Sequence, residues 1–567
     1  MNRSELRNKL IIFFYLFVVT WLIFTITGQI YGVNDDVILQ NWLSGQYTGK
    51  PELMIRGSAT PRILFGVIVS NLYSLVPQIN WFSIVLLGLT LISWYLIGLI
   101  SIKTNNLLVL ISYSIVTFLH LIWFIPSPTY TASAAILSFS TIVYVAFSIR
   151  NQSFSKLLYV LFLLYAFAYL VRPESFLLGT AAAGAFLFFA LLVTMKEFKT
   201  TIRRTYVGLI LCLVVIGGDY AYERFFYSQN KDWGTYKKWE IARYKIQANA
   251  PEKIVSSDPS KYGWTQAEVE LFQSYNYIDP KNFTVLKFEK LIEESDAFNV
   301  NVNFRHVNET HQKIFDSDVN WEWKRLISIT SLFYVIFLLI SLPRVRNYIL
   351  LTTSGYGILY FIMFYIAGFL RQPERVQVSV IFLATLVSLI SYIFTKKDTK
   401  LISSSPTILL GGLMLILVFS NAFAQSKYLA NKIPKWSDSF WYTQTEYLSG
   451  FPADSVFVGN ASQFRNNWLT PYLVSDIEVE DRILTFGWHN FSPHWIKRAQ
   501  KLQLNPYNIF ESVISDPRVY WVSDLLTMGY IVQYMKENGF EFNGPKKVGV
   551  MSYFEDEYVV WDFSRNE

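Results

Sequence analysis

Long apolar runs separated by short polar junctions dominate the chain up to about residue 424. The first run, over about 10–30, follows a basic N-terminus and is long enough to cross a bilayer. It has neither the short core nor the small-residue cleavage site of a signal peptide, so it predicts an uncleaved membrane anchor. Further runs lie near 81–101, 107–125, 131–149, 157–171, 176–195, 205–224, 326–343, 347–368, 376–395 and 404–424. The pattern predicts a polytopic α-helical membrane protein with about eleven spans.

Basic residues fall at alternate junctions between these runs, which indicates the side of the membrane on which each junction lies. Lys and Arg concentrate in short cytoplasmic loops, so the N-terminus and the basic junctions are predicted to be cytoplasmic. The remaining junctions, at 126–131, 172–175 and 371–375, then face outside. The basic junctions are marked by Lys103, Arg150, Lys156, Lys196, Lys199, Arg203, Arg204, Arg344, Arg346, Lys396, Lys397 and Lys400.

One apolar run, 63–77, breaks this alternation. It is short and carries Ser70, Asn71 and Ser74. If it crossed the membrane, either the N-terminus or every later loop would lie on the wrong side. The run therefore predicts a helix that lies on the outer leaflet or dips into it.

Three longer segments are predicted to project outward: 31–80, 225–324 and 425–567. In the second, Thr265-Gln-Ala-Glu268 is a capping-box pattern that predicts the start of a short helix. In the third, β-like runs at 455–459, 483–486, 519–522 and 558–562 alternate with helical stretches near 493–503 and 524–538. The pattern predicts a transmembrane domain over 1–424 and a small extracytoplasmic α/β domain over 425–567.

Composition agrees with the membrane class and narrows the choice of partners. Hydrophobic residues make up 52% of the 567 residues and charged residues 16%, which excludes an ordinary soluble domain. The net charge of +7 comes with basic residues in short loops, so it indicates topology and not nucleic-acid binding. With Cys212 as its one cysteine, the chain cannot form an internal disulfide.

An acidic pair, Asp35-Asp36, follows the first apolar run. Asn34 or Asp35 could cap a helix over 37–43, but a cap accounts for one of these residues and not for two adjacent carboxylates. Carboxylates at a membrane surface are costly unless water, a cation or a reacting group uses them. The pair is therefore a candidate general base or a candidate metal ligand.

Arginines recur at two outward junctions, where the positive-inside rule makes them uncommon. The candidates for binding an anion such as a lipid phosphate are Arg172, Arg371 and Arg375. Each junction also carries a glutamate, Glu174 or Glu374, which could pair with the arginines internally. The hydroxyl-rich loop 129–133 could line a sugar site, although a helix N-cap is the simpler interpretation. The histidine pairs His306/His311 and His489/His494 are spaced five apart, which does not suit two ligands on one helical face.

This layout resembles the GT-C superfamily of integral membrane glycosyltransferases. Its members begin with a cytoplasmic N-terminus and one span, and an acidic motif opens a large first outer loop. Asn34-Asp35-Asp36 stands at that position, and 63–77 matches a helix lying along the membrane. Arg172-Pro-Glu174 is similar to the Arg-Pro-Glu turns of many bacterial members, and 371–375 to a late outer loop that contacts lipid phosphate. The resemblance covers roughly 1–424, and 425–567 matches only as a variable outer domain.

The resemblance implies a hexosyltransferase that moves a sugar from a polyprenyl-phosphate donor to a cell-envelope glycan or polymer at the outer face of the cell membrane. Asp35 or Asp36 would accept the acceptor's proton, with Asp35 preferred by analogy, and Asn34, Glu174 and Glu374 would support the site. Arg172, Arg371 and Arg375 would stabilise the departing lipid phosphate. Whether a divalent cation, Mg²⁺ or Mn²⁺, binds Asp35 and Asp36 stays open.

Three other functions remain as alternatives. A lipid-linked polysaccharide polymerase or ligase also uses outward arginines, but it does not need an acidic pair after the first span. A transporter or flippase usually places ionisable residues in mid-membrane and shows internal repeats, and neither feature stands out here. A non-catalytic scaffold for envelope assembly could keep the same fold.

Overall fold

The computed structural model describes most of the chain. The described residues are 3–27, 34–52, 61–151, 157–193, 198–248, 259–294, 330–331, 334–335, 337–338, 345–369, 374–395, 447–460, 464, 472, 481–553 and 556–563. The predicted run 404–424 and most of 326–343 lie outside these residues, so the predicted number of spans stays a prediction.

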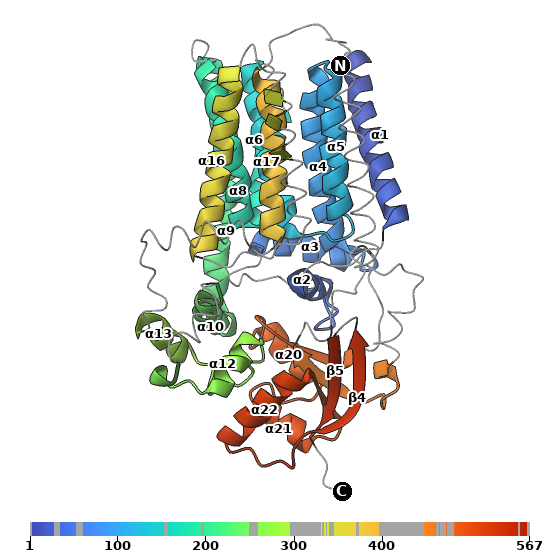
Figure 1. Ribbon diagram of the computed structural model, residues 1–567, viewed down its shortest axis with the longest axis vertical. Helices are drawn as coiled ribbons and strands as arrows, with labels where there is room; N and C mark the ends of the chain where they lie inside the picture. Colours follow the sequence, from blue (N-terminus) through green and yellow to red (C-terminus); the bar gives the residue numbers. More distant parts are fainter. Residues whose placement is uncertain are drawn as a thin grey trace.

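Eight of the described helices are long and apolar enough to cross a membrane, which is typical of a multi-pass membrane protein. They run side by side in a bundle, with the shorter α7 (Leu157–Val171) among them (Figure 1). The eight are α1 (Arg3–Ile26), α4 (Trp81–Lys103), α5 (Leu107–Phe124), α6 (Tyr130–Arg150), α8 (Pro173–Val193), α9 (Phe198–Gln229), α16 (Val345–Phe369) and α17 (Glu374–Thr395).

Burial separates central helices from peripheral ones. In the most apolar window of α6 and of α17, 89% of the residues are buried, against 22% for α1 and α9. The exposed side chains of α1 include Phe13, Phe14 and Trp21, which suits contact with lipid tails. The helices α6 and α17 therefore form the centre of the bundle, and both begin at the end where the candidate site lies.

Small residues let α6 and α8 approach each other closely. A Cβ added to Gly179 of α8 would lie 2.1 Å from the carbonyl oxygen of Ala135 in α6. A small residue on each side of a helix contact allows this approach in membrane proteins. The contact fixes the start of α8 against α6, and that junction carries Arg172.

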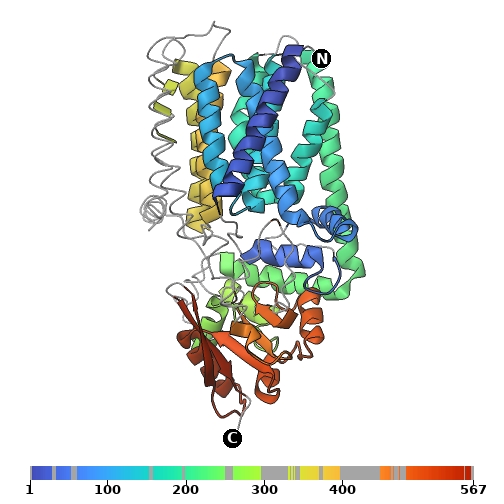
Figure 2. The same cartoon turned by 90° about the vertical axis from the view of Figure 1, so that its right-hand side faces the viewer.

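Two short helices, α2 (Asn34–Ser44) and α3 (Ile63–Leu75), lie across the end of the bundle (Figures 1 and 2). The 13 residues of α3 rise only about 20 Å, less than the roughly 30 Å hydrocarbon core of a bilayer. Its length and its orientation across the bundle agree with the prediction of a helix that does not span.

The outer part of the molecule contains a small mixed sheet, as the alternating pattern predicted. Its strand order is β2-β1-β3-β5-β4, in which β1 pairs in parallel with β2 and β3, and β5 pairs antiparallel with β3 and β4. The strand β4 and the helix α21 were not predicted. The elements are β1 (Val456–Asn460), β2 (Ile483–Phe486), α20 (Pro493–Lys501), α21 (Ile509–Ser515), β3 (Val519–Ser523), α22 (Leu525–Glu537), β4 (Lys546–Tyr553) and β5 (Asp556–Asp562).

The described part of the second outer segment packs on this α/β region. It contains α10 (Lys231–Ala248), η2 (Pro259–Tyr262), α12 (Gln266–Gln273) and α13 (Val285–Glu294). Thr265 and Glu268 form the predicted capping box of α12. Buried side chains of both segments form one hydrophobic core. We call this combination, residues 231–294 and 447–563 as described, the outer unit, a name that refers to its place beyond one end of the helix bundle (Figure 1).

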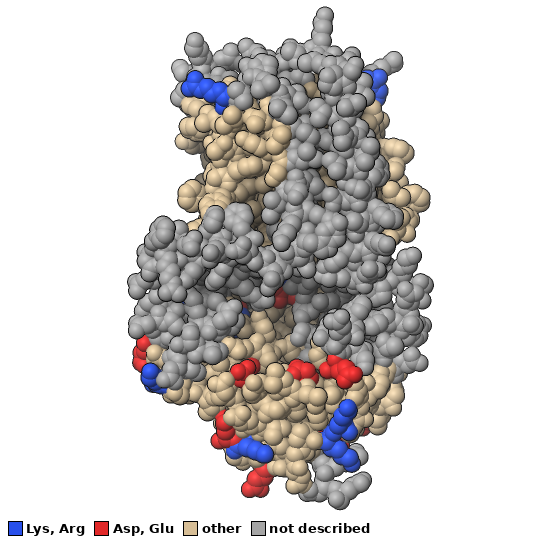
Figure 3. Space-filling view, viewed as in Figure 1, with Lys and Arg blue, Asp and Glu red and all other residues tan. Residues whose placement is uncertain are grey.

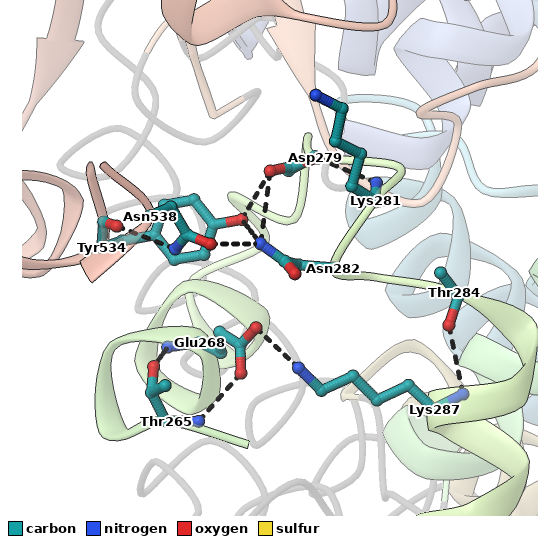
Figure 4. Close-up of polar contacts among 9 residues, drawn as sticks. All are labelled: Thr265, Glu268, Asp279, Lys281, Asn282, Thr284, Lys287, Tyr534 and Asn538. Atoms are coloured by element: carbon teal, nitrogen blue, oxygen red, sulfur yellow. Dashed lines mark hydrogen bonds and ion pairs between the residues drawn. The ribbon is translucent and has the colours of Figure 1, made fainter. Parts of the chain in front are cut away.

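Polar side chains join the two segments of the outer unit (Figure 4). Asn282 donates to the hydroxyl oxygen of Tyr534 at 2.7 Å and to the side-chain oxygen of Asn538 at 2.6 Å. The Tyr534 hydroxyl donates in turn to Asp279 at 2.7 Å. These bonds cross about 250 residues of sequence, so no local pattern could have predicted them.

Candidate functional site

Asp35 and Asp36 lie in the first turn of α2 and face different neighbours. Adjacent helical residues point about 100° apart, so one helix can present two carboxylates to two environments. Asp36 is fully buried, whereas the Asp35 side chain keeps 25% of its exposure. The helix itself is placed between two cores, because Leu39 and Leu43 pack into the bundle while Trp42 packs into the outer unit.

Both carboxylate oxygens of Asp35 accept a hydrogen bond from a distant segment. Arg375, at the start of α17, donates through Nη2 to Oδ2 at 3.0 Å. Trp488, in the loop after β2, donates through Nε1 to Oδ1 at 3.0 Å. Asp35 is thus held in one orientation by the bundle on one side and by the outer unit on the other.

Asp36 is fully buried and has fewer polar contacts than Asp35. The backbone N–H of Tyr130 donates to Oδ1 at 3.4 Å, and Oδ2 has no hydrogen-bond partner among the described residues. Burial raises the pKa of Asp36 to about 8, although the positive charge of Arg375 and of Arg172 opposes the rise. Asp36 is therefore largely protonated at neutral pH.

Arg172 completes the polar group from the α7–α8 junction. Its Nη1 donates to the Thr131 hydroxyl at 2.5 Å, and its guanidinium lies 4.8 Å from the centre of the Tyr130 ring. Arg375 lies 5.9 Å from the same ring, so two guanidinium groups flank Tyr130. The Nε atoms of both arginines are buried with no hydrogen-bond acceptor among the described residues.

The glutamate next to Arg172 neutralises it only weakly. Glu174 Oε2 lies 3.8 Å from Arg172 Nε, and the Glu174 side chain is 54% exposed. An exposed pair at that distance contributes little. The predicted internal pairing is present, but it leaves the donors of Arg172 available to an anion.

The structure thus brings together four of the predicted site residues: Asp35, Asp36, Arg172 and Arg375. Arg371 and the side chains of Asn34 and Glu374 lie outside the described residues. Sequence reasoning missed Trp488, because nothing in its local sequence marks it. The predicted hydroxyl-rich loop is largely the first turn of α6, which contains Tyr130 and Thr131. Thr129 caps this helix, as the simpler interpretation predicted, by accepting from the N–H of Ala132.

A hollow separates the bundle from the outer unit on the face shown in Figure 3, and acidic side-chain atoms lie inside it. Side-chain contacts also join the outer unit to the segment after α2. Glu52 accepts from Lys497 at 2.9 Å and lies 2.7 Å from His494 Nδ1. Burial alone would raise the pKa of Glu52, but His494 and Lys497 hold it down at about 2. Glu52 is therefore charged at any physiological pH. Its ion pair with Lys497 joins the segment after α2 to the outer unit.

A second buried ion cluster supports α3. Arg62, just before α3, pairs through Nε with Asp219 of α9, and its Nη2 lies 2.6 Å from Glu223. The N–H of Leu64 also donates to Asp219 at 3.0 Å, and Lys237 pairs with Glu223 at 2.7 Å. Because Arg62 and Asp219 are almost fully buried, this cluster is a structural joint between α3 and α9 and not a ligand site.

The acidic pair does not fit a divalent cation. Both oxygens of Asp35 already accept from nitrogen donors, one of them an arginine, and Oδ1 of Asp36 accepts from the backbone N–H of Tyr130. A divalent cation binds through carboxylate and other oxygens that are free to face it, and an arginine at the same carboxylate competes with it. Among the described residues, no group of three His, Cys, Asp or Glu side chains converges on one point. We therefore derive no step through a metal.

Comparison with known proteins gives no function for this chain, so the inference of a function depends on the fold and the site. No family model matches the chain, and no curated protein sequence matches it. The class that the structure supports is a multi-pass helical membrane protein with an outer α/β unit. The resemblance to GT-C glycosyltransferases stays a hypothesis.

The buried carboxyl of Asp36 makes stability depend on pH. An unfolded carboxyl loses its proton near pH 4, and this one only near 8, so ionisation between those values favours the unfolded state. We expect Asp36→Asn to melt at a higher temperature than the wild type at pH 8 and at a similar temperature at pH 4. A difference of about four pKa units, at roughly 1.4 kcal/mol for each unit, limits this gain in stability to about 6 kcal/mol.

The measurement is thermal unfolding in detergent from pH 4 to 9. Asp516→Asn serves as the control, because the hydrogen bond and charge of Arg518 lower the pKa of this surface carboxyl. Its replacement should lower stability slightly at neutral pH, by less than about 1 kcal/mol. A stability difference between Asp36→Asn and the wild type that stays flat with pH would contradict the buried, protonated state.

Proposed function

We propose that this protein is a GT-C-like membrane glycosyltransferase. In this proposal the chain has about eleven spans, a cytoplasmic N-terminus and an extracytoplasmic outer unit. It moves a sugar from a polyprenyl-phosphate donor to a cell-envelope glycan or polymer. The observation that carries the proposal is the convergence of Asp35 with Arg172 and Arg375, from three separate segments, at one end of the bundle.

The two aspartates have different roles in the proposed reaction. Asp36 is protonated near neutral pH, so it is a poor proton acceptor. Asp35 is paired with Arg375, is partly exposed, and has its carboxylate held in place by Trp488. We therefore assign the general base to Asp35, a choice that previously depended on analogy alone.

The proposed reaction is a sugar transfer that involves no oxidation or reduction. The acceptor hydroxyl gives its proton to Asp35 while its oxygen forms a bond to the anomeric carbon of the sugar. The bond between that carbon and the phosphate oxygen breaks, and polyprenyl phosphate leaves with the electron pair. Arg172 and Arg375 face the growing negative charge with donors that lack acceptors among the described residues.

The direct test is donor turnover by the purified protein in lipid nanodiscs. The donors are a panel of polyprenyl-phosphate hexoses and pentoses and, for comparison, polyprenyl-diphosphate-linked glycans, and the readout is the free polyprenyl phosphate or diphosphate. Transfer from at least one donor, with loss of the sugar from the lipid, is the expected result. Turnover confined to diphosphate-linked glycans would point to a polymerase or ligase instead, and no turnover of any lipid-linked sugar would contradict the proposal.

Within this assay we expect Arg172→Gln to raise the KM for the donor by about 10- to 100-fold, because a hydrogen bond to a charged group is lost. Arg518→Gln is the matched control, because this arginine is partly exposed on the outer unit and forms an ion pair with the nearby Asp516. It should leave the donor KM unchanged. Equal effects of the two substitutions would rule out a specific phosphate contact at Arg172.

A further inference from the structure

The loop that carries Trp488 is held rigidly by the outer unit. The Tyr236 hydroxyl donates to the carbonyl oxygen of Trp488 at 3.1 Å. Asn490 accepts from the N–H of Gly487 at 3.0 Å and donates to the carbonyl oxygen of Tyr277 at 3.3 Å. Backbone and side chains from both segments of the outer unit therefore fix this loop, and with it the position of the indole.

The Trp488 side chain reaches from this loop to α2. Its ring contacts the Trp42 ring edge to face, with centroids 5.4 Å apart, and its Nε1–H points at Asp35 Oδ1. Trp42 provides a contrast, because its own Nε1 is buried with no acceptor among the described residues. Of these two neighbouring indoles, Trp488 therefore has the polar contact with the acidic pair.

We propose that Trp488 is a positioning residue for Asp35, so that the outer unit completes the active site. The inference rests on the proposed function. A carboxylate rotates easily about its terminal bond, so one donor from Arg375 leaves its orientation loosely defined. A second donor on the other oxygen fixes the plane of the carboxylate and directs its remaining lone pairs toward the acceptor hydroxyl.

The test replaces one atom. β-(3-Benzothienyl)alanine has the shape of tryptophan but a sulfur in place of the N–H, and it is introduced at position 488 in the full chain. We expect kcat for donor turnover to fall by about 10- to 100-fold, the effect of losing a hydrogen bond to a charged group, with the donor KM within about two-fold of wild type. The same replacement at position 42 is the matched control and should leave kcat unchanged.

Each other outcome overturns a particular claim. An unchanged kcat at position 488, with an active wild type, overturns the positioning role and leaves the proposed function standing. A raised KM for the acceptor at constant kcat would make Trp488 an acceptor contact instead. A melting temperature that falls together with kcat would make its role structural. If the replacement gives no folded protein, Trp488→Phe, which also lacks the N–H, is compared with Trp42→Phe, which loses the same ring volume. Absence of turnover by the wild type contradicts the proposed function itself.

Discussion

Replacing Asp35 with asparagine should abolish sugar transfer while the protein still folds. Asparagine keeps the size of the side chain and an oxygen that can accept from Trp488 Nε1, but it cannot take a proton from the acceptor. Loss of a general base usually costs about 10²- to 10⁴-fold in rate, so we expect a fall of that size in kcat. The measurement is release of polyprenyl phosphate in nanodiscs, together with the glycan composition of cell envelopes that express the variant.

Asp36→Asn is the informative comparison, because it changes the neighbouring carboxyl by the same one atom. Asp36 is largely protonated at neutral pH, and asparagine resembles that neutral form. We expect its loss of activity to be at least about ten-fold smaller than that of Asp35→Asn. The reverse order would move the base to Asp36, and wild-type activity in both variants at normal protein levels would remove the acidic pair from the mechanism.

The largest effect on stability is expected at Arg62. Arg62→Met removes the partner of Asp219, a carboxylate that is fully buried against α3. Removing one member of a buried ion pair typically costs about 3–5 kcal/mol, because the other charge is left uncompensated. Glu223 keeps Lys237 as a partner, so the cost should come mainly from Asp219. Thermal unfolding in detergent and the yield of folded protein measure the effect.

A second substitution tests this explanation. In the double variant Arg62→Met with Asp219→Asn, the buried charge is gone and the asparagine oxygen can still accept from the N–H of Leu64. We expect the double variant to recover most of the lost stability. Arg518→Met, which breaks a surface pair, should cost less than about 1 kcal/mol. A double variant no more stable than Arg62→Met would show that Arg62 acts through packing and not through its charge.

Much of the secondary structure follows from local patterns. The apolar runs predicted α4, α5, α6, α7, α8, α16 and α17 nearly at their observed bounds, whereas α9 extends beyond the predicted run 205–224 at both ends. The alternating runs predicted β1, β2, β3 and β5. The exposed β4 was missed, because Lys546–Tyr553 has no continuous apolar face to mark it. Phe283 and Tyr534, which lie on either side of the predicted boundary at 425, pack in one hydrophobic core.

The candidate site could be predicted residue by residue but not as an arrangement. Asp35, Arg172 and Arg375 stood out because charge at a membrane surface is costly without a use. Their mutual contact could not be predicted, because Asp35 and Arg375 are 340 residues apart. Trp488 is 453 residues from Asp35 and had no local signal at all.

Hydropathy, basic loops and the acidic pair were thus enough to indicate a membrane protein and to select its charged candidates. These properties depend on the free energy of moving each residue type from water into lipid, and that free energy can be assigned from the sequence alone. The different surroundings of Asp35 and Asp36 are set only by the tertiary structure. Two adjacent carboxyls with the same intrinsic chemistry differ here because packing buries one completely and brings Arg375 and Trp488 to the other. Burial and charge contacts set the protonation of a group, and both arise only when distant segments meet.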